Sequence, residues 1–161
     1  MVTDLNGLDV RAFLAAVAEK FTLEKTVAPY RPDGPGKFGM YLENEWFALK
    51  IKPQYLPAHD PVAQLDISLL GEQLIVPILG IHDPRRDKRI DFVGGIRGLQ
   101  ELERRVASGE MSVAFSLFPT SLTQLMAVAD AGKVMPPKST WFEPKLADGL
   151  VKTIEYFKKI I

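Results

Sequence analysis

A strand–helix–strand pattern over residues 89–118 constrains the fold of this chain more than any other feature of its sequence. The run at 89–93 is β-rich, and the run at 111–118 is apolar throughout, as is typical of a strand covered on both faces. Strand–helix–strand units of this length favour a right-handed parallel crossover, so we expect the two strands to lie parallel in one sheet. Between them, apolar residues recur at helical spacing up to a Ser-Gly pair: Ile96, Leu99, Leu102 and Val106.

A second helix is predicted directly after this unit. Residues 119–121 have the sequence Pro-Thr-Ser, which suits a helix start, and Gly132 suits the C-terminal cap. The spacing predicts that one face of this helix points inward, formed by Leu122, Leu125, Met126 and Ala129.

The first half of the chain adds two helices and a hairpin. Asp9 is a suitable N-cap for an amphipathic helix over residues 9–20, and a short strand is expected at 21–26. The runs at 37–42 and 46–52 are β-rich and are separated by Glu-Asn-Glu, which indicates a hairpin. Between these elements, residues 29–36 hold three prolines and two glycines and predict a loop.

The remaining helix is expected to begin at Asp60-Pro61 and to end at Pro77. We therefore predict one α+β domain over residues 1–161. Its mixed β-sheet contains the hairpin and the βαβα unit, and the helices pack on the sheet. The tail at 150–161 is expected to begin as a strand and to continue as a short basic helix.

Composition narrows the function classes. The formal net charge is zero, from 20 basic and 20 acidic side chains, which makes nucleic acid an unlikely partner. The chain has no cysteine, so thiolate chemistry and disulfides are excluded, and this suits a reducing compartment. No apolar run approaches the length of a membrane span, and we expect a cytoplasmic protein without a membrane partner.

Three segments contain side chains that could bind a ligand or take part in catalysis. Arg97 lies in a glycine turn before a helix, where backbone amides could hold an anion, although a structural turn is the favoured interpretation. The charged run around His82 is interpreted as a solvated connection, and no metal site is predicted. Lys138, Ser139 and Thr140 follow two prolines and could bind a phosphate or carboxylate; alternatively, the hydroxyls bond to local backbone.

Several of these segments resemble the bacterial and archaeal family known as domain of unknown function 1015. The middle of that family is similar to residues 38–42 and 79–84, and its closing region to residues 89–95, 115–121 and 127–146. The resemblance implies that the chain is the C-terminal domain of a longer protein. The N-terminal half of such a protein would be ParB-like and related to free-serine kinases.

The resemblance leaves the activity open. The Asp-Gly-His-His-Arg signature of that N-terminal half has no counterpart here, because His59 and His82 are isolated. We therefore expect an accessory domain, inactive alone, which supports a nucleotide-dependent site in the longer protein. Its expected partners are the N-terminal half and a phosphorylated or carboxylate small molecule, with no cofactor in this chain. The alternative is a regulatory module that binds protein or nucleic acid, and a third hypothesis is an enzyme built around Lys138 and His82.

Overall fold

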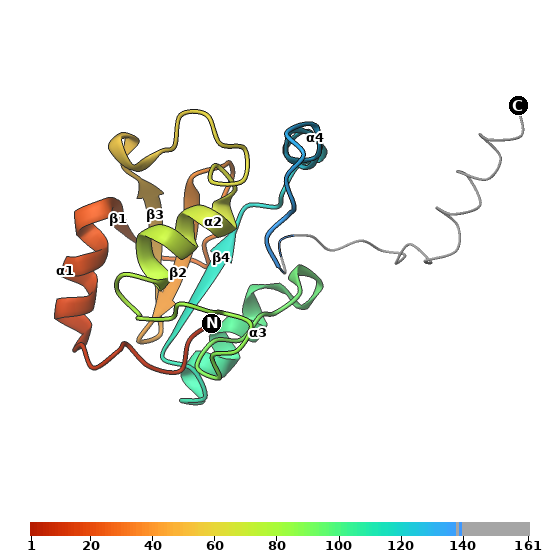
Figure 1. Ribbon diagram of the computed structural model, residues 1–161. Coiled ribbons are helices and arrows are strands. Elements are labelled where there is room, and N and C mark those ends of the chain that lie inside the picture. Colours follow the sequence, from red (N-terminus) through yellow and green to blue (C-terminus); the bar gives the residue numbers. More distant parts are fainter. Residues whose placement is uncertain (138, 140–161) are drawn as a thin grey trace, which may run out of the picture.

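Four antiparallel strands form the sheet at the centre of the computed structural model (Figure 1). They are β1 (Phe21–Thr26), β2 (Lys37–Leu42), β3 (Glu45–Ile51) and β4 (Val113–Leu117), in the spatial order β1-β3-β2-β4. The structure describes residues 1–137 and Ser139, and the predictions for the 150–161 tail lie outside this part. The α+β class is confirmed, whereas the predicted mixed sheet is wrong, because each strand pair in the described residues is antiparallel.

The predicted hairpin is formed by β2 and β3. Leu42 pairs with Glu45, and the two residues between them have positive φ angles of 48° and 63°. These angles are those of a type I′ turn, whose twist matches the twist of the flanking strands. Asn44 tolerates such a backbone well, which makes this short connection favourable.

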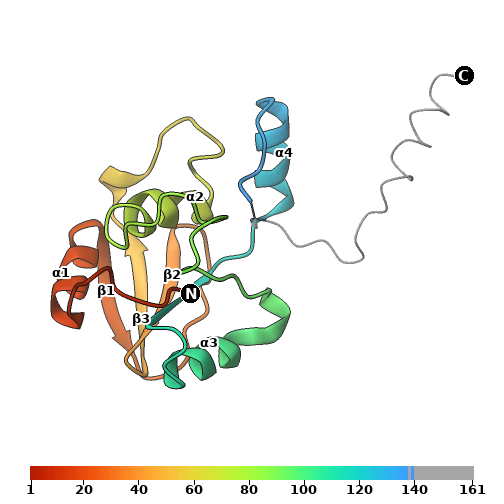
Figure 2. The ribbon, with the colours of Figure 1, turned by 60° about the horizontal axis from the view of Figure 1, so that its bottom comes forward.

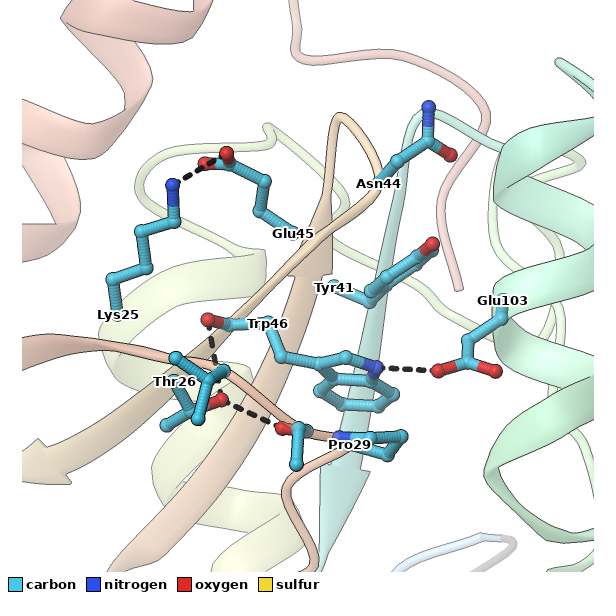
Figure 3. A pocket seen from close by; sticks show the side chains of 10 residues that line it. Lys25, Thr26, Pro29, Tyr41, Asn44, Glu45, Trp46 and Glu103 are labelled. Carbon is cyan, nitrogen blue, oxygen red and sulfur yellow. Dashed lines mark hydrogen bonds and ion pairs between the residues drawn. The ribbon is translucent and has the colours of Figure 1, made fainter.

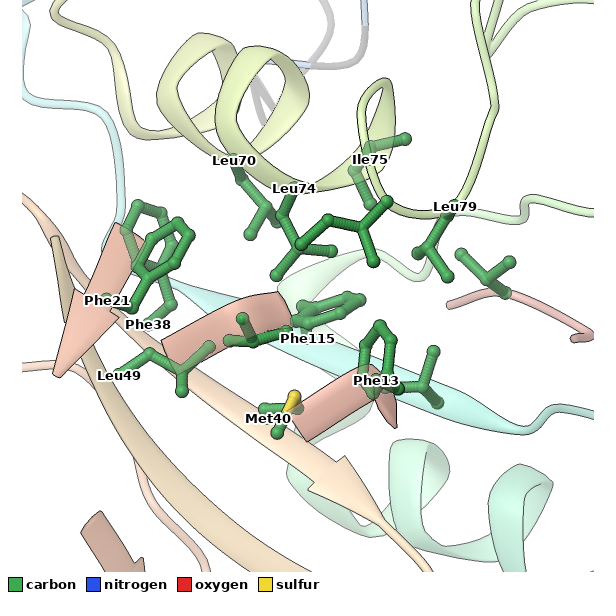
Figure 4. Packing of buried hydrophobic residues seen from close by; sticks show 14 of the residues in the cluster. Phe13, Phe21, Phe38, Met40, Leu49, Leu70, Leu74, Ile75, Leu79 and Phe115 are labelled. Atoms are coloured by element: carbon green, nitrogen blue, oxygen red, sulfur yellow. The ribbon is translucent and has the colours of Figure 1, made fainter. Parts of the chain in front are cut away.

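One face of the sheet packs on α1 (Val10–Lys20) and on α2 (Asp66–Leu70), which continues as the π-helical segment η2 (Gly71–Ile75). Alternate residues of each strand point into this core, as Figure 4 shows. Its fully buried side chains include Phe13, Phe38, Met40, Leu49 and Leu74. Phe47, Leu49 and Ile51 of β3 contribute to the same core.

The other face of the sheet is covered by α3 (Gly98–Ala107). In Figure 2, α2 and α3 lie on opposite sides of the strands. A second, smaller apolar cluster fills this side, composed of Met1, Tyr41, Trp46, Leu102, Val106, Met111 and Ala114. Both faces of the sheet are therefore buried. This explains why residues 111–118, which include β4, are almost all apolar.

The two strands of the predicted parallel crossover do not pair, because the N-terminal segment of the chain lies between them. Val2 bridges Val113 on one side and Ile90 on the other, and both bridges are antiparallel. Residues 89–91 and 111–113 consequently run in the same direction but are separated by the N-terminal segment. The backbone N–H of Val2 donates to the Val113 carbonyl at 2.8 Å, and that of Asp91 donates to the Met1 carbonyl at 2.9 Å.

The helix expected from Asp60 begins later than predicted. The Asp60 carboxylate accepts the backbone N–H of Val62 at 2.9 Å, but this contact closes a turn, and α2 starts only at Asp66. A short 3-10 helix, η1 (Pro53–Tyr55), precedes this region.

α4 (Leu122–Asp130) stands away from the sheet in Figures 1 and 2. Its start was predicted correctly, since Ser121 and Gln124 form a capping box. Its inward face was not, because Leu122 and Met126 are 70% and 56% exposed, and Val128 is the buried residue of the helix. In the described part of the chain, no helix is long and apolar enough to cross a membrane.

Candidate functional site

An open pocket of about 410 Å³ lies beside the hairpin turn, between the end of β1 and helix α3 (Figure 3). The side chains that shape it come from four segments of the chain. Thr26 and Pro29 lie at and after the end of β1, Tyr41 and Trp46 come from β2 and β3, and Glu103 comes from α3. The pocket exists because α3 packs on this face of the sheet and brings a carboxylate to two aromatic residues.

Trp46 and Glu103 form the floor of the pocket. The indole N–H donates to the Oε1 atom of Glu103 at 2.8 Å, and only 4% of the Trp46 surface is exposed. The Tyr41 ring lies against the indole with a centroid distance of 5.1 Å. The hydrogen bond from the indole satisfies the single donor of Trp46 and fixes one oxygen of the Glu103 carboxylate. The other carboxylate oxygen is left for a ligand.

Tyr41 brings a hydroxyl into the pocket without a partner. The residue as a whole is 7% exposed, but its hydroxyl oxygen is open to the pocket and makes no hydrogen bond to the protein within residues 1–137 and Ser139, where no enclosed side-chain oxygen or nitrogen is left unpaired. Figure 3 shows the hydroxyl pointing towards the Asn44 and Glu103 side chains. Burial, and secondarily the charge of Glu103, raise the pKa of Tyr41, so the phenol stays protonated and neutral.

Three polar side chains at the rim of the pocket already have partners within the protein. Lys25 and Glu45 form an ion pair at 2.5 Å, and the Thr26 hydroxyl donates to the Ala28 carbonyl at 2.8 Å. Because Lys25 neutralises Glu45, the charge that remains to attract a ligand is that of Glu103. Exposed ion pairs of this kind contribute little to stability, about 0–1 kcal/mol.

Arg97, a predicted anion ligand, is exposed on the short 3-10 helix η3 (Gly95–Arg97). Its backbone N–H donates to the Gly94 carbonyl at 3.0 Å, and Gly98 adopts a positive φ of 70° before α3 begins. This geometry is that of a structural turn, the interpretation favoured from the sequence. Binding of an anion by Arg97 stays a prediction.

The predicted Lys138-Ser139-Thr140 site is described only at Ser139. The Ser139 hydroxyl donates to the Pro136 carbonyl at 2.6 Å, and the Thr120 hydroxyl donates to the Ser139 carbonyl at 3.0 Å. Lys138 and Thr140 lie outside the described residues. The grouping of these three side chains around an anion, and their convergence with His82, therefore stay predictions.

Asp66 is a buried acid that the sequence analysis did not single out. It is 7% exposed, and its carboxylate accepts the backbone N–H of Gly36 at 2.7 Å. Burial raises its pKa to about 6, and the bond from Gly36 opposes this shift. The sequence contains only an indirect indication of this contact: the proline- and glycine-rich loop before β2 needs hydrogen-bond partners for its backbone amides.

No group of three or more His, Asp or Glu side chains that could hold a metal ion occurs in the part of the chain that the structure covers. The two histidines, His59 and His82, are both exposed there. The charged run beyond His82 forms surface ion pairs, as Asp83 contacts Arg85 at 3.4 Å and Arg86 at 3.8 Å.

The chain is thus an α+β domain with an open pocket whose walls include two aromatic side chains and a carboxylate. Residues 1–68 match the model of a family described as "Protein of unknown function (DUF1015)". This stretch contains α1, strands β1 to β3, and the pocket residues Tyr41 and Trp46. No curated protein and no solved structure matches the chain.

The family match falls on a different part of the chain from most of the predicted resemblance. It includes residues 38–42, whereas the segments compared with the family's closing region, 89–146, lie beyond it. The likeness to the family is therefore supported over fewer than half of the residues. The ParB-like relationship and the C-terminal placement stay predictions.

Proposed function

We propose that this chain is a binding domain whose pocket takes a ligand with a cationic N–H group, an ammonium or a guanidinium. The observation that carries the proposal is the Tyr41 hydroxyl, which opens into the pocket beside the Glu103 carboxylate and makes no hydrogen bond to the described residues. The hydroxyl is therefore free to pair with a ligand, which replaces water there, and the net gain from one such hydrogen bond is about 0.5–1.5 kcal/mol.

The donor and acceptor pattern favours a cation over an anion. Glu103 retains one carboxylate oxygen, Tyr41 supplies a hydroxyl oxygen, and Asn44 supplies an amide that lines the same opening. An ammonium or guanidinium group carries several N–H donors, which these oxygens accept. The nearest cation, Lys25, is held by Glu45, so it neither fills the site nor attracts an anion to it.

The cationic group could belong to a free small molecule or to a lysine or arginine side chain of a protein partner. The second source agrees with an accessory domain that docks onto another part of a longer protein. A calorimetric titration distinguishes them, with free methylguanidinium in one arm and an unstructured arginine-containing peptide in the other. We expect dissociation constants on the order of 1 mM for methylguanidinium, since few contacts are available. Tighter peptide binding would indicate a protein source.

The variant Glu103→Gln tests the role of the charge. The amide oxygen can still accept the Trp46 indole N–H, so the fold is kept, but the charge-assisted bond to the ligand is lost. Such a bond is worth about 1.5–3 kcal/mol, which corresponds to a roughly tenfold or greater loss of affinity. Glu72→Gln, at an exposed glutamate that does not line the pocket, is the matched control and should bind as the wild type does. Equal binding of acetate and methylguanidinium by the wild type would reject the proposal.

A second candidate is the accessory role in a nucleotide-dependent, ParB-like and kinase-related protein. It rests on the resemblance of the sequence to that family, since the family matched over residues 1–68 has no described function. Near its candidate loop, the Thr120 hydroxyl donates to the Ser139 carbonyl at 3.0 Å. Titration of the longer protein with ATP tests it, and loss of binding in Lys138→Ala, but not in Lys133→Ala, is the expected result. A longer protein that binds neither nucleotide nor phosphate would rule it out.

The alternative of nucleic-acid binding receives less support from the charge distribution. Arg105 contacts both Asp91 and Glu110 at 2.5 Å, and Arg104 contacts Glu101 at 2.8 Å. Arg89 is paired with Asp87 at 2.9 Å. Phosphate binding depends on cations that are available to replace counterions, and these arginines are already paired.

A further inference from the structure

The four residues after β1, which we call the strap (residues 27–30), cross the face of the sheet that carries the pocket. The first three line the pocket, and Tyr30 packs against the smaller apolar cluster on that face. The strap begins at edge strand β1 and reaches β4 at the opposite edge of the sheet, and none of its residues belongs to a helix or strand. Its path therefore depends on the contacts that hold its two ends.

The start of the strap is fastened by Thr26, the last residue of β1. Its hydroxyl donates to the Ala28 carbonyl at 2.8 Å, and the carbonyl of Trp46, its pairing partner in β3, lies 3.3 Å away as a second acceptor. A threonine hydroxyl has a single proton, so both carbonyls share it. The Thr26 side chain thus joins the strap to the backbone of the residue whose indole forms the pocket floor.

The end of the strap is fastened by Ser116 of β4. Ser116 is 8% exposed, and its hydroxyl donates to the Tyr30 carbonyl at 3.0 Å. The contact lies over Gly39, where an added methyl group would be 2.6 Å from the Tyr30 carbonyl oxygen and 3.0 Å from Cζ3 of the Trp46 ring. The fastened end of the strap and the edge of the indole therefore meet at one point of the sheet.

These contacts leave the Trp46 indole little freedom to rotate. Pro29 of the strap lies beside the ring in Figure 3, and the Tyr41 ring packs against it at a centroid distance of 5.1 Å. The indole N–H donates to the Glu103 carboxylate at 2.8 Å, and this bond fixes one carboxylate oxygen. A ligand binds best when packing holds the binding side chains in the productive rotamer before it arrives. A strap that moved would let the ring turn and would release the carboxylate.

We propose that Thr26 and Ser116 are positioning residues of the pocket. They fasten the strap, the strap holds the Trp46 indole, and the indole holds Glu103 in the orientation that accepts a cation. Ser116 does not line the pocket, so it acts only through the strap. This inference rests on the proposed function, but its first step concerns the protein without ligand and can be measured separately.

Threonine variants test the start of the strap. Thr26→Val removes the hydroxyl and keeps the shape of the side chain, whereas Thr26→Ser keeps the hydroxyl. The control is Thr22→Val on the same strand, where the hydroxyl donates to the Lys50 carbonyl at 3.3 Å outside the pocket. In NMR titrations with methylguanidinium, we expect about three- to tenfold weaker binding in Thr26→Val, since one hydrogen bond supports an effect of this size. Thr26→Ser and Thr22→Val should bind as the wild type does.

Ser116→Ala tests the end of the strap in the same way. Its control is Ser112→Ala, because the Ser112 hydroxyl donates to the Thr3 carbonyl at 2.6 Å, away from the pocket. Without ligand, exchange of the Trp46 indole N–H with water should become at least about threefold faster in both test variants, as the loss of one hydrogen bond allows. The two control variants should keep the wild-type rate, and the backbone amides of β2 should keep it in every variant. A general loss of stability would speed both kinds of exchange, so a change in the indole alone identifies a local effect.

Equal indole exchange in the test and control variants would overturn the proposal, as would a Thr26→Ser variant that behaves like Thr26→Val. Faster indole exchange with unchanged affinity for methylguanidinium would also overturn it, since the indole would then not position Glu103 for the ligand. A wild type that does not bind methylguanidinium would reject the proposed cation site, while faster indole exchange in the test variants alone would still support the role of the strap.

Discussion

Asp66 shows at the residue scale how one buried group makes stability depend on pH. Its pKa in the folded protein is about 6, raised by burial above its ordinary value of 3.8. Between these values the folded state binds a proton more tightly than the unfolded state. Its contribution to the free energy of unfolding therefore falls as pH rises from about 4 to about 6, and stays low above that range.

The variant Asp66→Asn removes this dependence and keeps an oxygen for the Gly36 N–H. At pH 7.5 it should be more stable than the wild type by up to about 3 kcal/mol, at about 1.4 kcal/mol for each pKa unit. Near pH 4 the two proteins should be equally stable. Urea unfolding at pH values from 4 to 7.5, within the range that both proteins tolerate, measures the difference. A difference that does not change with pH would show that Asp66 does not titrate as described.

Gly39 lies in the centre of β2, where other elements approach the backbone closely. A methyl group at this position would lie 2.6 Å from the Tyr30 carbonyl oxygen and would also meet the Ser116 hydroxyl. Ser116 donates to that carbonyl at 3.0 Å, so the loop after β1 is fastened to the sheet here.

The variant Gly39→Ala should accordingly lower the free energy of unfolding by about 1–3 kcal/mol through overpacking. Gly71→Ala is the control, because a methyl group there has no neighbour within 4 Å and the residue is helical. The control should be neutral or more stable by about 0.5–1 kcal/mol. Thermal unfolding of both variants checks this, and equal melting temperatures would contradict the close packing at Gly39.

At the scale of elements, α1 shows how a predicted cap works. The Asp9 carboxylate accepts the backbone N–H of Ala12 at 2.7 Å, as the sequence analysis expected from its position. Asp9→Ala should cost about 1 kcal/mol of stability, and Asp9→Asn should restore most of it. Glu19→Ala, at an exposed position of the same helix, should change stability by less than about 0.5 kcal/mol. Equal effects of the alanine variants at positions 9 and 19 would contradict a capping role.

Elements with local signals were predicted well. The N-cap of α1, the type I′ turn of the hairpin and the capping box of α4 all arise from residues within a few positions of each other. Orientation relative to the core was harder, as α4 shows. Its spacing correctly predicted an apolar face, but it could not indicate whether that face meets the sheet or faces away from it.

At the scale of the whole molecule, the errors come from contacts between distant residues. The parallel crossover failed because Val2 separates Ile90 from Val113, and no pattern near residues 89–118 indicates that the N-terminus lies there. The candidate site was missed for the same reason. Tyr41 and Glu103 are 62 positions apart in the sequence, and they meet only because α3 packs on the face of the sheet opposite α1 and α2.

The indole N–H resonance of Trp46 gives the most direct test of the central claim, because this group donates to the carboxylate that would hold the ligand. The resonance can be assigned with the variant Trp46→Phe in ¹H–¹⁵N correlation spectra. Titration with methylguanidinium should shift it progressively to saturation in the wild type and far less in Glu103→Gln. Acetate at the same concentration and ionic strength should leave it in place. A resonance that does not move with methylguanidinium, or that moves equally with acetate, would contradict a cation-binding pocket.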